Sequence, residues 1–182
     1  IGGAAHNAFG LDTLNVDRIS HEHPDFQPYA SEQKRLCGEV MPVDIVAPGD
    51  CIPVADKSFD FVISSHVIEH FYDPISAIKE WMRIATKYIF IICPQPDALE
   101  SDRGKPLTDL EEHTKRFSTH NTINDLHLYK GEKRKLVERM KADFEKIANT
   151  DEHHSRWTCQ SFANMCMWIY TQEWGKDWGT CA

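Results

Sequence analysis

The chain has few basic residues and lacks a long apolar run; basic residues and such runs are features of nucleic-acid-binding and membrane-spanning proteins. Lysine and arginine number 20 against 28 aspartates and glutamates, which gives a net charge of -8. Nucleic-acid-binding surfaces gain affinity by neutralising phosphates, so this balance argues against a nucleic-acid partner. The strongest apolar run, residues 88–94, is far too short to span a bilayer. We recognise no secretory signal and expect a cytoplasmic protein without a membrane partner.

Cysteine pairs of the kind that bind zinc or form a disulfide framework are also missing. Six cysteines are present, but no two of them form a C-x-x-C pair. Reduced thiols in a cytosolic protein are the simplest interpretation. The hydrophobic share of 41% and the charged share of 26% are typical of a globular protein. A length of 182 residues predicts one domain over residues 1–182.

The first half of the chain alternates strand and helix patterns. Short apolar segments predict strands at residues 13–17, 43–46, 59–64 and 88–93. Asp73 and Pro74 suit the N-cap and first position of a helix between the last two strands. This order predicts a βαβ unit with parallel strands. The predicted fold is therefore α/β, a Rossmann-like, doubly wound and mainly parallel sheet with helices on both faces.

The other segments are more polar. Residues 18–38 predict a loop with a helical turn or two, and residues 94–124 are rich in charge and turn residues. Apolar residues at helical spacing predict helices over residues 130–149 and 158–170. The continuous apolar character of residues 59–64 is typical of a strand covered on both faces.

Three segments near predicted strand ends carry candidate ligand-binding groups. The first segment contains the small residues Gly2, Gly3 and Ala4. Small residues after a strand let the backbone approach a ligand closely. Asp17 ends the next strand, where an acid can accept hydrogen bonds from a ribose. Asp50 follows the 43–46 strand and can accept from an exocyclic amine, with Ile52 packed on the ring. Each of these residues is also common in ordinary turns.

The segment Ser64–Phe71 (SSHVIEHF) allows two interpretations. His66, Glu69 and His70 match the H-x-x-E-H pattern of some zinc hydrolases. That pattern needs one helix, so that both histidines share a face. Here it follows a strand directly, and Asp73 starts a new segment three residues later. We therefore expect no metal ligands here and no stoichiometric zinc.

The order of these segments resembles the class I S-adenosylmethionine-dependent methyltransferases, specifically the methyltransferase type 11 group. Residues 56–94 (DKSFDFVISSHVIEHFYDPISAIKEWMRIATKYIFIICP) are similar to the fourth strand, following helix and fifth strand of that group. Residues 1–17 are similar to its glycine motif and second strand. The resemblance covers residues 1–96. It implies a cofactor-binding half there and an acceptor-side, capping half at residues 97–182.

The resemblance also implies a role for each candidate. Gly2, Gly3 and Ala4 would face the methionine part of S-adenosylmethionine, and Asp17 would hold its ribose. Asp50 would meet the adenine amine, with Cys51 and Ile52 beside the ring. Ser65 and His66 would lie nearest the transferable methyl group, with His66 as the catalytic candidate. The acceptor is unidentified, and the acidic charge favours a small molecule or a glycan-like group.

Two departures from the family pattern keep alternatives open. The family's first strand is absent apart from Ile1, which suggests a fragment, and Gly2 and Asp17 are closer in sequence than the usual first helix allows. An inactive methyltransferase-like binding module is one alternative, and the zinc hydrolase is another. Histidines in the second half are candidate bases for the acceptor, although loop histidines are commonly solvated; they are His113, His120, His127, His153 and His154.

Overall fold

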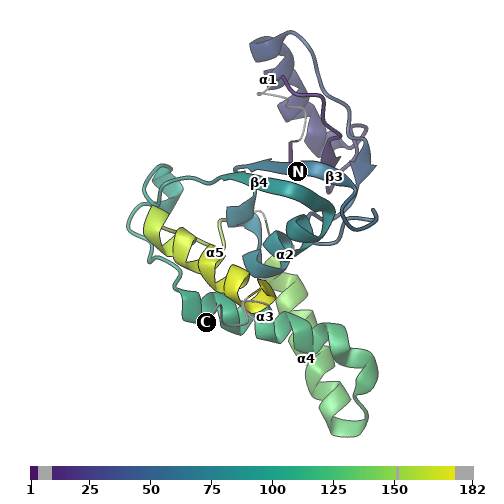
Figure 1. Cartoon of the computed structure of the whole chain (residues 1–182), viewed down its shortest axis with the longest axis vertical. Helices are drawn as coiled ribbons and strands as arrows, with labels where there is room; N and C mark the ends of the chain where they lie inside the picture. Colours follow the sequence, from purple (N-terminus) through teal and green to yellow (C-terminus); the bar gives the residue numbers. More distant parts are fainter. Residues whose placement is uncertain (4–9, 151, 175–182) are drawn as a thin grey trace, which may run out of the picture. The chain divides into compact units, whose positions relative to one another are not determined.

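A computed structural model describes residues 1–3, 10–150 and 152–174 of the chain (Figure 1). It divides into two compact units. The sheet unit comprises residues 1–68 and 77–93, and the helical unit comprises residues 69–76 and 94–182. Within the described ranges, no helix combines the length and apolar character needed to cross a membrane.

The sheet unit is built from parallel strand pairs with intervening helices. Its elements are β1 (Val16–Asp17), α1 (Gln27–Cys37), β2 (Ile45–Val46), β3 (Phe59–Ser65), α2 (Pro74–Ile84, which begins in the helical unit) and β4 (Ala85–Ile92). β1 pairs in parallel with β2, and β3 pairs in parallel with β4. The α/β class and the parallel βαβ unit are thus confirmed, within sheets of two strands each.

Residues 1 and 2 lie between the two strand pairs. The amino group of Ile1 donates a hydrogen bond of 2.7 Å to the carbonyl of Ile63 in β3. The next backbone N–H, that of Gly2, donates over 2.7 Å to the carbonyl of Val16 in β1. Backbone hydrogen bonds therefore run from β2 through β1 and residues 1–2 to β3 and β4.

The core of the sheet unit is formed by one face of β3 and the apolar stripe of α2. Val62 and Ser64 alternate as buried residues along β3. The buried α2 residues of this unit are Ala77, Ile78, Trp81 and Ile84. On the neighbouring strand β4, Tyr88 and Phe90 are 56% and 50% exposed. The prediction for residues 59–64 is met in part, because Val62 and Ser64 are buried on one face of β3 whereas the other face is only half-buried.

The helical unit contains three long helices, which are α3 (Leu110–Asn124), α4 (Gly131–Ala148) and α5 (Cys159–Trp174) (Figure 1). α3 packs against both of the others. Its N-cap is Asp109, whose carboxylate accepts from the N–H of Glu112 over 2.8 Å. α2 has the same type of N-cap: the carboxylate of Asp73 accepts a hydrogen bond from the N–H of Ser76. The predicted start of α2 is thereby confirmed.

The sequence predictions of single elements differ in quality. The predicted helices at 130–149 and 158–170 correspond to α4 and α5. In the segments 13–17 and 43–46, the observed strands are shorter than predicted. Only the two residues of β1 and the two residues of β2 pair with each other there. The segments 18–38 and 94–124 contain the full helices α1 and α3, which the polar composition did not indicate.

Candidate functional site

Gly2 occupies a backbone position in the sheet unit that requires glycine. Its φ angle is +64°, in the left-handed region. A Cβ atom placed on it would lie 2.4 Å from Cγ2 and 2.7 Å from Cγ1 of Val67. Real Cβ atoms do not approach carbon so closely, so a side chain here would displace the loop that follows β3. Gly2 thus packs closely against the side chain of Val67.

The carboxyl ends of β1 and β3 meet at Gly2. Its N–H bonds to Val16, the residue before the end of β1. The neighbouring Ile1 bonds to Ile63, two residues before the end of β3. The strand-end residues Asp17 and Ser65 therefore lie at the carboxyl ends of the two strand pairs that residues 1–2 connect. Open α/β sheets bind ligands at the carboxyl edge of their strands.

Asp17 and the Asp50 loop are connected through the backbone. The N–H of Ala47 donates to the carbonyl of Asp17 over 2.9 Å, which ties the chain after β2 to the end of β1. The Asp17 carboxylate accepts from the N–H of Ile19 over 3.3 Å. It also lies close enough to the Ile1 amino group for electrostatic attraction. Asp50 lies in the following turn, which the N–H of Cys51 closes on Pro48.

The two neighbours of Asp50 differ in exposure. Cys51 is exposed, whereas Ile52 is only 2% exposed. The backbone of Ile52 is held by α2: its N–H donates to the Glu80 carboxylate over 2.7 Å, and its carbonyl accepts from Arg83 over 2.9 Å. These two hydrogen bonds to the Ile52 backbone anchor the turn that carries Asp50 to α2.

Three α2 side chains hold this turn, and sequence reasoning missed all three. The indole N–H of Trp81 donates to the carbonyl of Gly49 over 2.7 Å. Arg83 donates to the carboxylate of Glu80 through two nitrogens, each at 2.7 Å. The hydrogen bonds from Arg83 hold the pKa of Glu80 below its usual value, although burial opposes this shift. A salt-bridged, ionised Glu80 is therefore the form that supports the loop.

His66 follows β3 in a strained conformation. Its φ angle is +55°, which is uncommon for a residue with a side chain. Its N–H donates to the carbonyl of Ile92 at the end of β4 over 2.9 Å, and its side chain is exposed. Backbone strain of this kind concentrates at functional sites. His66 thus directly follows the end of β3, with an exposed side chain.

The H-x-x-E-H pattern does not form a helix that joins both histidines. Only Ile68–His70 is helical, as a single 3-10 turn, and His66 precedes it in the left-handed conformation. The helix geometry that the zinc hydrolase interpretation needs is therefore absent from residues 66–70. Of the predicted cofactor contacts, Ala4 lies outside the described residues.

The histidines of the helical unit are held by neighbouring side chains. His113 is 1% exposed, and its Nε2 accepts from the indole N–H of Trp157 over 2.7 Å. Burial, with a smaller contribution from the nearby Arg116 charge, lowers the pKa of His113 to about 4. His120 contacts the Asp73 carboxylate through Nδ1 at 2.8 Å. A neutral, buried His113 is part of the core and does not face solvent.

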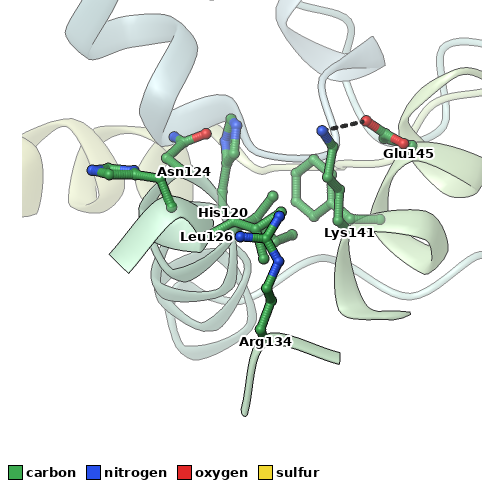
Figure 2. A pocket seen from close by; sticks show the side chains of 9 residues that line it. His120, Asn124, Leu126, Arg134, Lys141 and Glu145 are labelled. Carbon is green, nitrogen blue, oxygen red and sulfur yellow. Dashed lines mark ion pairs between the residues drawn. The ribbon is translucent and has the colours of Figure 1, made fainter. Parts of the chain in front are cut away.

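A pocket of about 520 Å³ lies between α3 and α4 (Figure 2). Its volume is typical of small-molecule sites. Lys141 is paired with Glu145 at 3.6 Å, and Arg134 pairs with Glu138 at 2.8 Å. The lining mixes apolar and ionisable side chains: His120, Ile123, Asn124, Leu126, His127, Arg134, Lys141, Phe144 and Glu145. Such a lining suits a polar small molecule.

Parallel strand pairs with polar groups gathered at their carboxyl ends define a class of α/β domain that binds ligands at that edge. Residues 12–91 match the family model described as a methyltransferase domain. This match confirms the resemblance to the methyltransferase type 11 group, and it indicates methyl transfer as the general chemistry. Comparisons with curated proteins and with solved structures gave no significant match.

Proposed function

We propose that this protein transfers a methyl group from S-adenosylmethionine to a small acceptor, and that the cofactor binds at the sheet edge around Gly2. The observation that carries this proposal is the pair of hydrogen bonds that places residues 1–2 between β1 and β3. From these residues the chain first continues to β1 and β2 on one side. It then returns to β3 and β4 on the other side.

A return of this kind is a topological switch point, where doubly wound sheets bind nucleotides. The hydrogen bonds support a strand order of β2, β1, residues 1–2, β3 and β4 in one Rossmann-like sheet. In this proposal, residues 1–182 act as one methyltransferase domain. Residues 1–96 bind the cofactor, and residues 97–182 bind the acceptor.

The residues at this edge fit the parts of the cofactor. A glycine cradle at Gly2 and Gly3, continued by Ala4, lets backbone groups approach the methionine moiety. Asp17 ends β1, where its carboxylate can accept from both ribose hydroxyls. Asp50 can accept from the adenine amine. The exposed Cys51 and the buried Ile52 border the ring.

Alignment is the main catalytic task of this site. When bound, S-adenosylmethionine supplies a methyl group on a sulfonium, which is already a good leaving group. Ser65 and His66, at the end of β3, would orient the acceptor nucleophile toward that methyl carbon. The acceptor's proton passes to the imidazole of His66, which is the candidate general base. No further nucleophilic side chain is needed for direct transfer.

The acceptor in this proposal is a small molecule or a glycan-like group. The net charge of -8 disfavours a polyanionic nucleic acid. The pocket between α3 and α4 has the volume of a small-molecule site. We also propose that the protein acts in the cytoplasm.

Calorimetric titration of the full chain with S-adenosylmethionine tests this function. We expect saturable binding at one site per chain. Asp50→Ala and Asp17→Ala should each weaken binding by about 1–3 kcal/mol, the range for losing a partner of a buried polar group. The matched control is Asp60→Ala, because Asp60 lies near the amino end of β3 and is paired with Lys87.

Each outcome separates the proposal from its alternatives. Equal affinity of Asp17→Ala, Asp50→Ala and wild type would move the cofactor away from this edge. Absence of any binding would contradict the function. Binding without turnover on any acceptor tested would favour the inactive binding module.

A further inference from the structure

The helical unit brings together one carboxylate and two imidazoles that are distant in sequence. Glu69 and His70 lie in the 3-10 turn Ile68–His70, and His153 lies in the segment between α4 and α5. A ligand atom from each of these three residues lies within 4.8 Å of the other two. We infer that Glu69, His70 and His153 form a binding site for a divalent transition-metal ion, best suited to Zn²⁺. This proposal does not depend on the proposed methyl transfer.

Backbone hydrogen bonds hold the two segments together. The carbonyl of Glu69 accepts from the N–H of His154 over 2.8 Å and from the N–H of Ser155 over 3.2 Å. The rings of His70 and His153 are in edge contact, with centroids 4.7 Å apart and an angle of 86° between their planes. The donor groups are therefore positioned by the fold, and a metal ion does not have to gather them from flexible loops.

The surroundings favour binding of a cation. Glu69 is 1% exposed, and the side chain of His153 is 12% exposed. A cation bound beside the Glu69 carboxylate would offset the cost of burying its negative charge. Donor atoms around a tetrahedral zinc ion lie roughly 3.3 Å apart, which follows from metal–ligand distances of about 2.0–2.2 Å. The proposal requires side-chain rotations that bring the three donor atoms from within 4.8 Å of one another to that spacing.

His153 also has the outer partner that metal-binding histidines typically have. Its Nδ1 lies 2.5 Å from Oδ2 of Asp102, a residue with only 3% of its surface exposed. Lys105 and Arg156 approach the other carboxylate oxygen, Oδ1, each at 3.6 Å. Asp102 therefore fixes the ring and leaves Nε2 of His153 available as a ligand. A carboxylate that orients a ligating histidine in this way raises its basicity.

The donor set determines the metal class. Two imidazoles with one carboxylate suit Zn²⁺ or another first-row transition ion, whereas Mg²⁺ and Ca²⁺ prefer oxygen ligands. The sequence pattern pointed to His66 as the partner of His70, and that set requires a helix which is not formed. The structure substitutes His153, a residue 83 positions after His70. The expectation that the chain binds no zinc is replaced by this proposal.

The test is titration of the metal-stripped full chain, prepared without a histidine tag, with Zn²⁺ in competition with a chromophoric chelator. We expect one Zn²⁺ per chain. His70→Gln and His153→Gln should each weaken binding at least tenfold, and Asp102→Asn should weaken it about 10- to 100-fold, the range for an outer-shell partner. His154→Gln is the matched control, because His154 adjoins the site and its ring contacts Thr150. That variant should retain wild-type affinity.

Co²⁺ provides a second measurement that does not depend on variant stability. Wild type with one equivalent of Co²⁺ should show the intense visible absorption of a tetrahedral nitrogen and oxygen site. Circular dichroism of each variant confirms that it is folded before affinities are compared. Three results would overturn the proposal: no saturable Zn²⁺ binding, wild-type Zn²⁺ affinity in the His70→Gln and His153→Gln variants, or preferential binding of Mg²⁺ or Ca²⁺.

Discussion

Gly2 faces Val67 so closely that a methyl group on its α-carbon would overlap both methyl groups of the valine. The distances from the added Cβ would be 2.4 and 2.7 Å. The φ angle of +64° adds a second reason for glycine at this position. Because of this conformation and this close contact, Gly2 packs against Val67 in the loop after β3. We place the methionine part of the cofactor at this position.

Gly2→Ala should therefore destabilise the protein by more than the conformational cost alone. That cost is about 1–2 kcal/mol for a side chain in the left-handed region. The overlap with Val67 adds to it, and cofactor affinity should fall as well. Urea denaturation monitored by circular dichroism measures the free energy of unfolding.

Gly38→Ala is the matched control for Gly2→Ala. Gly38 has a φ angle of +80°, but no atom lies within 4 Å of an added Cβ. The second substitution Val67→Ala should partly rescue Gly2→Ala by removing the overlap. Equal losses in Gly2→Ala and Gly38→Ala, without rescue, would show that the close contact has no energetic weight.

Glu80→Gln should loosen the turn that carries Asp50. We expect a loss of about 1–3 kcal/mol in the free energy of unfolding at pH 7, since Arg83 and Ile52 each lose a charged partner. The folded-state pKa of Glu80 is depressed, so its contribution is present above the ordinary pKa of 4.5 and is lost as the pH falls below it.

Urea denaturation of wild type and Glu80→Gln at pH 7 and pH 3 tests this dependence. The difference between the two proteins should shrink at pH 3, because below pH 4.5 the unfolded state takes up a proton at Glu80 that the folded state resists. Lys79 lies beside Glu80 on the same helix, so Lys79→Gln controls for a general effect of charge removal. A pH-independent difference would mean that the ionised carboxylate is not the stabilising form.

His113 should make the protein less stable in acid. Its folded-state pKa of about 4 lies below the ordinary value of 6.5, because burial disfavours the imidazolium. The neutral ring is therefore favoured by folding, and stability should fall as the pH decreases from 6.5 toward 4. The shift corresponds to roughly 3 kcal/mol over that interval.

The measurement is urea denaturation of wild type and His113→Gln at several values between pH 7 and pH 4. Arg116 opposes protonation of His113, whereas Asp73, Asp109 and Glu112 favour it, so their charges act on the same slope. In His113→Gln the slope of unfolding free energy against pH should decrease in this window. An unchanged slope would assign the acid sensitivity to other groups.

The elements with strong local patterns were predictable, and those stabilised by tertiary contacts were not. β3 is apolar and α2 begins with an Asp-Pro start signal, so both were predicted nearly at their observed starts. β4 was predicted as a strand too, but it begins at Ala85, three residues earlier than expected. α3 has no regular apolar stripe, because its buried positions include His113 alongside Ile123. Its stability depends on packing against α4 and α5, which local sequence does not reveal.

The candidate site divides in the same way. Gly2, Asp17 and His66 stood out because residues at strand ends have a defined place in a parallel sheet. The groups that hold the Asp50 turn, such as Glu80 and Arg83, are charged helix residues of ordinary appearance. His153 stood out in the sequence only as one of five candidate bases in the second half, and its proximity to Glu69 and His70 was not predictable. Long-range contacts of this kind need the folded structure.

His66→Ala separates a catalytic role from a structural one. If the imidazole takes the acceptor's proton, turnover should fall roughly 100-fold or more, while cofactor affinity stays within about tenfold. His66→Gly is the informative second variant, because glycine relieves the strain at φ +55°. It should lose turnover equally and yet be at least as stable as His66→Ala. Equal turnover of wild type and both variants would remove His66 from the chemistry.

The most direct test of cofactor binding around Gly2 is a crystal structure of the full chain bound to S-adenosylhomocysteine, the product of methyl transfer. We expect the ribose hydroxyls to lie within hydrogen-bond distance of Asp17 and the adenine amine to contact Asp50. We also expect the sulfur atom to lie beside Gly2 and to face the His66 ring. Density for the nucleoside away from the ends of β1 and β3, or a His66 ring turned away from the sulfur, would contradict this proposal.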